Sequence, residues 1–219
     1  NRPRHGRHSH QRYLSPSAPA PTSRTCRRCD SYDTKFEDGS VTSSAQKLLS
    51  FLLVIGANED LDPGREHDGL MEALRLPVKE HPIKVFPPLM RATHMELVRR
   101  LTEDRPDVLH FVGHGDRGQV LLIDEVDNPR SLDEAMAADL FRALAQSGSV
   151  PQLVFLNCCL ALAVGKAIAR EGPTVVAFES RVADAWARRY ATIFYELCLG
   201  KGYDMDAANT LAINGAGPL

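Results

Sequence analysis

The chain has 219 residues, of which 43% are hydrophobic and 25% are charged, and its formal net charge is −2. This size and composition are typical of one globular domain with a hydrophobic core. A charge so close to zero gives no general attraction to nucleic acid or to an anionic membrane, so neither is expected as a partner. The longest apolar run, residues 48–57, is about half as long as the ~20 residues that a membrane span needs.

Residues 1–44 differ in composition from the rest of the chain. The first 29 residues carry seven arginines, three histidines and many Ser and Pro, but no acidic residue and no apolar periodicity. Such a segment buries too little surface to offset the entropy of ordering it. The sequence therefore predicts a disordered tail and linker over 1–44 and a folded domain over 45–219.

From residue 45 onwards, apolar runs alternate with amphipathic segments. The apolar runs predict buried strands at 51–57, 83–86, 107–113, 152–157 and 173–178. The amphipathic segments predict helices at 65–75, 93–103, 133–146, 161–171, 184–199 and 205–213. A short hairpin or edge strand is expected at 119–124. Strands that are apolar on both faces and separated by helices indicate an α/β fold whose mostly parallel sheet is flanked by helices on both sides.

Two of these strands end in residues that can carry chemistry. A Gly-His-Gly motif at 113–115 follows the third strand, and Asn-Cys-Cys at 157–159 follows the fourth. In open α/β sheets, ligands bind beyond the carboxyl ends of the strands. If these strands are neighbours, His114 and Cys159 lie side by side, as a base and a nucleophile must.

The cysteines and histidines of these two strands are expected to differ in their roles. Adjacent cysteines at a strand end point to opposite sides, so one faces the core and the other the sheet edge. We expect Cys158 to pack and Cys159 to react, because a helix that begins directly after Cys159 favours a thiolate there. His110 lies inside the strand, four residues before His114, and is expected to be a core histidine with its hydrogen bonds satisfied.

No metal or other cofactor is predicted. Cys26 and Cys29 have the spacing of zinc ligands, but only histidines of the tail could complete the four ligands that zinc requires. The segment 164–167, "VGKA", lacks the upstream glycine and the following Ser or Thr of a phosphate loop, which argues against a nucleotide-binding protein. The five cysteines, without a secretory signal, are expected to be reduced thiols in the cytoplasm.

The chain resembles the CHAT family, caspase-like domains of the same clan as caspases, separases and gingipains. The resemblance covers about residues 50–214 and includes "VLHFVGHG", "LVFLNCCLA" and a long closing block that begins "VVAFESRVADAWARRY". It implies a caspase-like three-layer sandwich and a cysteine endopeptidase that cleaves a protein or peptide substrate. In that family the general base corresponds to His114 and the nucleophile to Cys159. Together with the general chemistry, this implies an oxyanion held by the backbone N–H groups of Gly115 and Cys159.

The cleavage preference is a separate question. Arg-cutting relatives commonly have an acid two residues before the nucleophile, where this chain has a neutral amide. Four residues are expected to form a possible substrate pocket: Asp116, Asn157, Glu179 and Asp184. Because acids outnumber the one base of this region, Arg181, Arg or Lys before the scissile bond is expected to be preferred over Asp if the protein cleaves peptides. The alternative is that these charges are ordinary solvated residues at the edge of the sheet. For the function as a whole, the alternative is an inactive caspase-like module that binds a regulatory protein partner.

Overall fold

A computed structural model describes residues 11–14, 49–57, 63–75 and 83–217. Its main sheet has six strands in the order β1-β9-β8-β4-β2-β3. The five parallel strands are β2 (Leu49–Ile55), β3 (Ile83–Val85), β4 (Val108–Val112), β8 (Leu153–Asn157) and β9 (Thr174–Phe178). Each lies within a few residues of a predicted strand, and the predicted α/β fold with a mostly parallel sheet is confirmed.

The sixth strand was not predicted. It is β1 (Gln11–Leu14), which pairs antiparallel with the outer edge of β9. These four residues lie in a polar segment without apolar alternation, so the sequence carried no signal for a strand, and the order arises from pairing with an edge that is already formed. The other residues of 1–44, including Cys26 and Cys29, lie outside the described residues.

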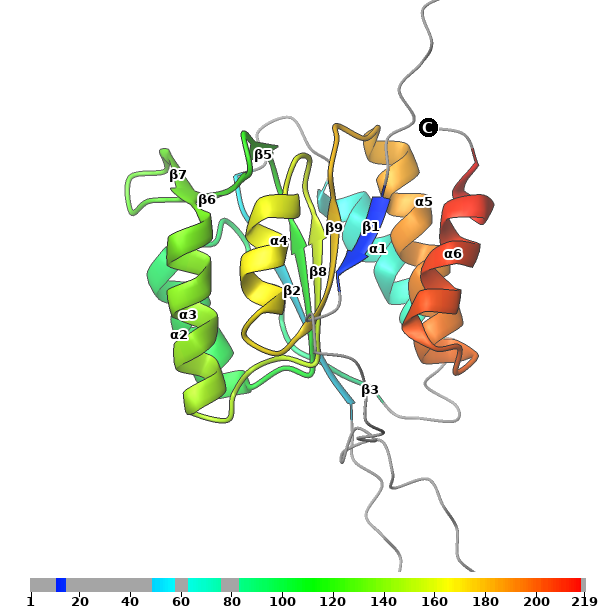
Figure 1. Cartoon of the computed structure of the whole chain (residues 1–219), viewed down its shortest axis with the longest axis horizontal. Helices are drawn as coiled ribbons and strands as arrows, with labels where there is room; N and C mark the ends of the chain where they lie inside the picture. Colours follow the sequence, from blue (N-terminus) through cyan, green and yellow to red (C-terminus); the bar gives the residue numbers. More distant parts are fainter. Residues whose placement is uncertain (1–10, 15–48, 58–62, 76–82, 218–219) are drawn as a thin grey trace, which may run out of the picture. The chain divides into compact units, whose positions relative to one another are not determined.

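Helices cover both faces of the main sheet (Figure 1). One face carries α2 (His94–Asp104), α3 (Glu134–Gln146) and α4 (Leu162–Ala169). The other carries α1 (Pro63–Arg75), α5 (Asp184–Tyr195), its π-helical continuation η3 (Glu196–Gly200), and α6 (Met205–Ala216). The molecule therefore has three layers, with a hydrophobic core on each side of the sheet. No helix in the described part of the chain is long and apolar enough to cross a membrane.

The two central strands, β4 and β8, are buried along their whole length. Their side chains alternate between the two cores, as the pleat of a strand requires. Phe111 and Leu156 pack on the side of α2, α3 and α4, whereas Val112 and Phe155 pack on the side of α1, α5 and α6. This alternation decides which helices lie over the residues at the ends of the two strands.

A small antiparallel sheet follows β4. It consists of β5 (Gly115–Asp116), β6 (Gln119–Ile123) and β7 (Pro129–Leu132). The turn between β5 and β6 is made by Arg117 and Gly118, with φ values of 48° and 82°. Two positive φ angles in a two-residue loop define a type I′ turn, which suits the twist of a hairpin. The hairpin expected at 119–124 is thus present, and it begins immediately after His114.

Candidate functional site

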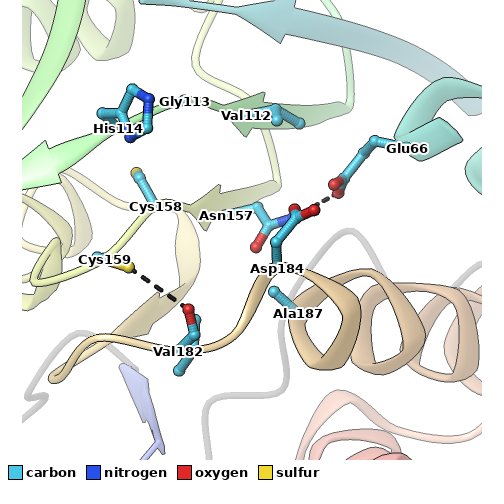
Figure 2. A pocket seen from close by; sticks show the side chains of 10 residues that line it. All are labelled: Glu66, Val112, Gly113, His114, Asn157, Cys158, Cys159, Val182, Asp184 and Ala187. Atoms are coloured by element: carbon cyan, nitrogen blue, oxygen red, sulfur yellow. Dashed lines mark hydrogen bonds between the residues drawn. The ribbon is translucent and has the colours of Figure 1, made fainter. Parts of the chain in front are cut away.

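The two strands that carry the motifs are neighbours. β4 and β8 pair in parallel, with Val112 opposite Asn157. His114 and Cys159 each lie two residues beyond these positions, at the same edge of the sheet. Both line one small cavity of about 60 Å³ (Figure 2). The structure thus brings together the two residues on which the sequence analysis centred.

Gly115 accounts for the close approach of the two loops. A Cβ atom added to this glycine would lie 1.9 Å from the carbonyl oxygen of Cys159 and 3.0 Å from its carbonyl carbon. Both atoms belong to the backbone and cannot turn aside, so only glycine fits. The neighbour that requires glycine at this position is thus the loop that contains Cys159.

The backbone of His114 is fixed on both sides. Its N–H donates to the carbonyl of Ala57 at 3.2 Å, and its carbonyl accepts from the N–H of Leu121 at 3.0 Å. These bonds connect the histidine to the end of β2 and to the small sheet. The half-buried imidazole is therefore presented to the cavity by an anchored backbone.

The two adjacent cysteines differ in burial, but both line the cavity, and in Figure 2 it is the Cys158 side chain that is directed toward His114. Cys158 is 3% exposed and packs in the core on the side of α2, α3 and α4. This burial, with a smaller contribution from the neighbouring Cys159, raises the pKa of the Cys158 thiol far above its ordinary value. Cys159 is half-buried, and its thiol donates to the carbonyl of Val182 at 3.8 Å (Figure 2). Within the described residues, no hydrogen bond joins Cys159 to His114.

The helix after Cys159 begins later than predicted. α4 starts at Leu162, and Ala161 occupies its N-cap without a side-chain hydrogen bond. Leu160 has a left-handed backbone with φ of 56°, which cannot belong to the helix. The predicted helix over 161–171 thus begins one residue later than expected, and Leu160 and Ala161 separate it from Cys159. The support that the helix dipole gives to a thiolate is weaker than expected, because this effect falls off within the first turn.

A buried polar network lies behind the cavity. Glu66, in the first turn of α1, is 3% exposed and also lines the cavity. Its Oε1 atom accepts from the side-chain amide of Asn157 and is 3.2 Å from Nε2 of His110. Nδ1 of His110 is 2.9 Å from the hydroxyl of Tyr195. The fully buried His110 thus has a partner at each ring nitrogen, which confirms the prediction of a satisfied core histidine.

Glu66 was not among the site residues predicted from the sequence. The available signal was its position on the helix: Glu66 precedes Leu70 and Leu74 by four and eight residues and so lies on the same apolar face. A carboxylate on the buried face of a helix needs polar partners. Here β4 and β8 provide them, and α5 provides the hydroxyl that contacts His110. Which partners they are depends on tertiary packing.

The four predicted pocket residues divide into two groups. Asn157 and Asp184 line the cavity. Asp184 begins α5 and forms an ion pair with Arg188 one turn later. Asp116 does not line it: this side chain is 56% exposed and lies 3.8 Å from Arg117 in the hairpin turn. Glu179 also lies elsewhere, in a groove of about 480 Å³.

That groove adjoins the site on the side of Leu160, the residue after Cys159. It contains more basic than acidic side chains. Its charged lining residues are Arg117, Lys166, Arg170, Glu134 and Glu179. Glu179 therefore faces a mixed, mainly basic environment, which does not support its assignment to an acidic pocket.

The described residues contain no group of three or more His, Cys, Asp or Glu side chains that could hold a metal ion. The chemistry available at the cavity is that of two thiols, an imidazole, two carboxylates and an amide. These groups suit nucleophilic and acid–base reactions. In comparisons with known proteins, the chain matches no protein-family model and no curated protein.

Proposed function

We propose that the protein is a cysteine endopeptidase in which Cys159 is the nucleophile and His114 the general base. One observation carries the proposal: the two side chains line the same cavity, from adjacent strand ends whose backbones are in contact at Gly115. A cysteine and a histidine on neighbouring loops are the arrangement that nucleophilic catalysis needs. The three-layer architecture is compatible with the caspase-like fold that we infer from the sequence, and we place the protein in the cytoplasm, where thiols stay reduced.

The proposed reaction begins with a movement of the thiol. In the structure, the Cys159 sulfur faces Val182, and substrate binding would turn it toward His114. The imidazole then takes the thiol proton, and the sulfur attacks the carbonyl carbon of the scissile peptide bond. When the tetrahedral intermediate collapses, the C–N bond breaks and His114 protonates the leaving amine. Water, deprotonated by His114, hydrolyses the thioester and releases the acid and the free thiol.

Backbone N–H groups of Gly115 and Cys159 are the proposed donors to the oxyanion. Gly115 lies opposite Val120 in β6, and the next pair is joined by the bond from Leu121 N–H to the His114 carbonyl. Hydrogen-bonded and non-hydrogen-bonded pairs alternate along an antiparallel ladder, so the Gly115 N–H is directed away from β6. One such donor accelerates acyl transfer by roughly 10²–10³-fold in well-studied enzymes.

The alternative is a protein-binding module without activity. It is favoured by the orientation of the Cys159 thiol, which donates to Val182 rather than to His114. Apo enzymes frequently have loose catalytic hydrogen bonds that tighten only with substrate, so this orientation does not decide the matter.

A thiol-directed peptide probe distinguishes the two functions. We expect a peptidyl acyloxymethyl ketone to label Cys159 and His114→Ala to slow this labelling strongly, because the base no longer generates thiolate. His94→Ala, at the start of α2, is the control and should label at the parent rate. Labelling of Cys159 that is equally fast in parent and His114→Ala, without cleavage of any peptide in a diverse library, would support the binding module.

A further inference from the structure

We propose that Glu66 is the specificity-determining residue of the cavity, and that it binds the cationic side chain of an Arg or Lys that precedes the scissile bond. The inference rests on the proposed peptidase function, which it deepens. It differs from the expectation based on exposed acids, because Asp116 and Glu179 lie outside the cavity. Four observations carry it.

The first observation is an unpartnered oxygen. The Glu66 carboxylate is buried and points into the cavity (Figure 2). Both of its hydrogen bonds, from His110 and Asn157, are made to Oε1. Within the described part of the chain, Oε2 accepts no hydrogen bond. Buried carboxylate oxygens are nearly always hydrogen-bonded, so Oε2 lacks a donor that a molecule entering the cavity can supply.

The second observation is how the carboxylate is held. Nε2 of His110 lies 3.2 Å from Oε1 of Glu66, and Nδ1 of the same ring lies 2.9 Å from the hydroxyl of Tyr195. The side-chain amide of Asn157 donates to the same oxygen, Oε1. These contacts fix the orientation of the carboxylate and leave Oε2 for a ligand.

A cation is the donor that suits this oxygen best. Hydrogen bonds between a carboxylate and the charged group of Arg or Lys are shorter and roughly twice as strong as those between neutral groups. A guanidinium or ammonium group that enters the cavity can therefore satisfy Oε2 better than a neutral donor can.

The third observation is the charge of the remaining lining. No lysine or arginine is among the described residues that line the cavity, and the second carboxylate, Asp184, is already paired with Arg188. The amino ends of α1 and α5 contribute a partial positive charge that offsets part of the two negative charges. An acidic ligand would meet like charges, and an apolar ligand would leave Oε2 without a donor.

The fourth observation is the amide at position 157. An aspartate there would place a second carboxylate in contact with Glu66, and the two negative charges would repel each other. Asn157 instead donates to Glu66 and holds it in place. In this pocket the negative charge thus comes from α1 rather than from the end of β8, and Asn157 is a positioning residue.

The test uses binding, so that it does not depend on cleavage. In the full chain carrying Cys159→Ala, the probes are two blocked tripeptide amides that end in Arg or in its uncharged isostere citrulline. We expect the Arg peptide to bind at least about tenfold more tightly, and Glu66→Gln to remove this difference, because a hydrogen bond to a charged group is lost. Glu72→Gln, an exposed change on the same helix, should retain the difference.

Three outcomes would overturn the proposal. These are equal binding of the Arg and citrulline peptides in the parent, a difference that survives Glu66→Gln, and a difference that is also lost in Glu72→Gln. Thermal unfolding confirms that each variant is folded. A second variant adds Asn157→Asp to Glu66→Gln, which moves the carboxylate across the cavity and should restore part of the preference for Arg.

The same peptides, extended past the scissile bond, separate the two proposals in the protein with Cys159 intact. Cleavage with a preference for Arg that Glu66→Gln removes supports both. Selective binding without any cleavage overturns the peptidase and leaves the role of Glu66 standing. Cleavage with equal kcat/KM for Arg and citrulline substrates overturns the role of Glu66 and leaves the peptidase standing.

Discussion

The adjacent residues Cys158 and Cys159 provide a matched pair for testing the nucleophile. Cys159→Ala should abolish peptide cleavage, because it removes the sulfur that we propose as the nucleophile. Cys158→Ala should keep most of the activity and lower the free energy of unfolding by about 1 kcal/mol, since it truncates one buried atom of the core. Peptide hydrolysis and denaturant unfolding measure the two effects. An inactive but stable Cys158→Ala together with an active Cys159→Ala would show that the roles are reversed.

Gly115 supports a prediction about backbone packing. In Gly115→Ala the new methyl group meets the Cys159 carbonyl, so the two loops must move apart. We expect a loss of about 1–3 kcal/mol of stability, as in overpacked cores, and a loss of activity that exceeds it.

Gly69→Ala is the control for this change. Its Cβ would make an ordinary contact of 3.6 Å with Thr192, and alanine suits the interior of α1. We expect a gain of about 0.4–1 kcal/mol. Thermal melts and cleavage rates of both variants give the measurement. A Gly115→Ala protein with unchanged melting temperature would mean that the loops are not in contact.

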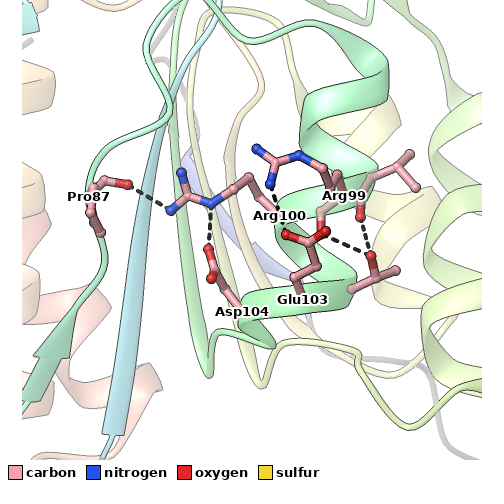
Figure 3. A network of polar contacts seen from close by, with 7 residues as sticks. Pro87, Arg99, Arg100, Glu103 and Asp104 are labelled. Carbon is pink, nitrogen blue, oxygen red and sulfur yellow. Dashed lines mark hydrogen bonds and ion pairs between the residues drawn. The ribbon is translucent and has the colours of Figure 1, made fainter.

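In helix α2, the adjacent residues Arg99 and Arg100 form ion pairs in different environments (Figure 3). Arg99 pairs with Glu103 on the surface, where both side chains are more than half exposed. Arg100 pairs with Asp104 in a partly buried position and also donates to the carbonyl of Pro87 at 2.8 Å. Arg100 thus connects α2 to the segment that follows β3.

This difference predicts different costs of truncation. Arg100→Ala should lower the free energy of unfolding by about 1 kcal/mol, because the partly buried carboxylate of Asp104 and the carbonyl of Pro87, an exposed residue, both lose their donor. Arg99→Ala should cost no more than about 0.5 kcal/mol, as exposed helix pairs do. Urea unfolding at equal ionic strength compares them, and equal losses would contradict the special role of Arg100.

The elements also show how far the sequence alone can lead. β4, β8 and the helices were predictable, because apolar runs and helical periodicity are local signals. β1 was not, since its order depends on pairing with the edge of β9. The start of α4 was predicted to within one residue, but the left-handed backbone of Leu160, which is unusual for leucine, was not.

The candidate site was predictable only where its residues follow local sequence signals. His114 and Cys159 each follow an apolar run, which identifies them as residues just beyond the ends of strands. Glu66 reaches the site through the packing of α1 on β4 and β8, and its partners could not be identified from local sequence.

Two thiols and one phenol whose pKa values are raised by burial predict that the protein loses stability at alkaline pH. Burial raises the pKa of Cys198 from 9.0 to about 12 and shifts the pKa values of Cys158 and Tyr195 upward as well. In the unfolded chain these groups release their protons nearer their ordinary values, so at high pH the unfolded state binds fewer protons. Their contribution is complete below about pH 9 and is lost as the pH rises toward 12 and beyond.

Unfolding by urea at about pH 8 and about pH 10.5 measures this effect, which approaches about 1.4 kcal/mol per pH unit for each fully ionised group. Cys198→Ala should show a shallower decline than the parent. A stability that is flat over this range would mean that these groups are accessible to water in the native state.

The polar network behind the cavity also bears on the order of folding. Its bonds join residues that lie 44, 85 and 91 positions apart, from α1, β4, β8 and α5. Contacts of such separation carry a large loop-closure entropy, so we expect them to form after the local helices and hairpins. The β4 and β8 loops could meet as soon as those two strands pair, whereas the carboxylate and its partners assemble only when α1 and α5 both dock on the sheet. A nascent chain would then have the proposed reactive pair before it has the proposed means of selecting a substrate, and pulsed hydrogen exchange would reveal the interval between the two events.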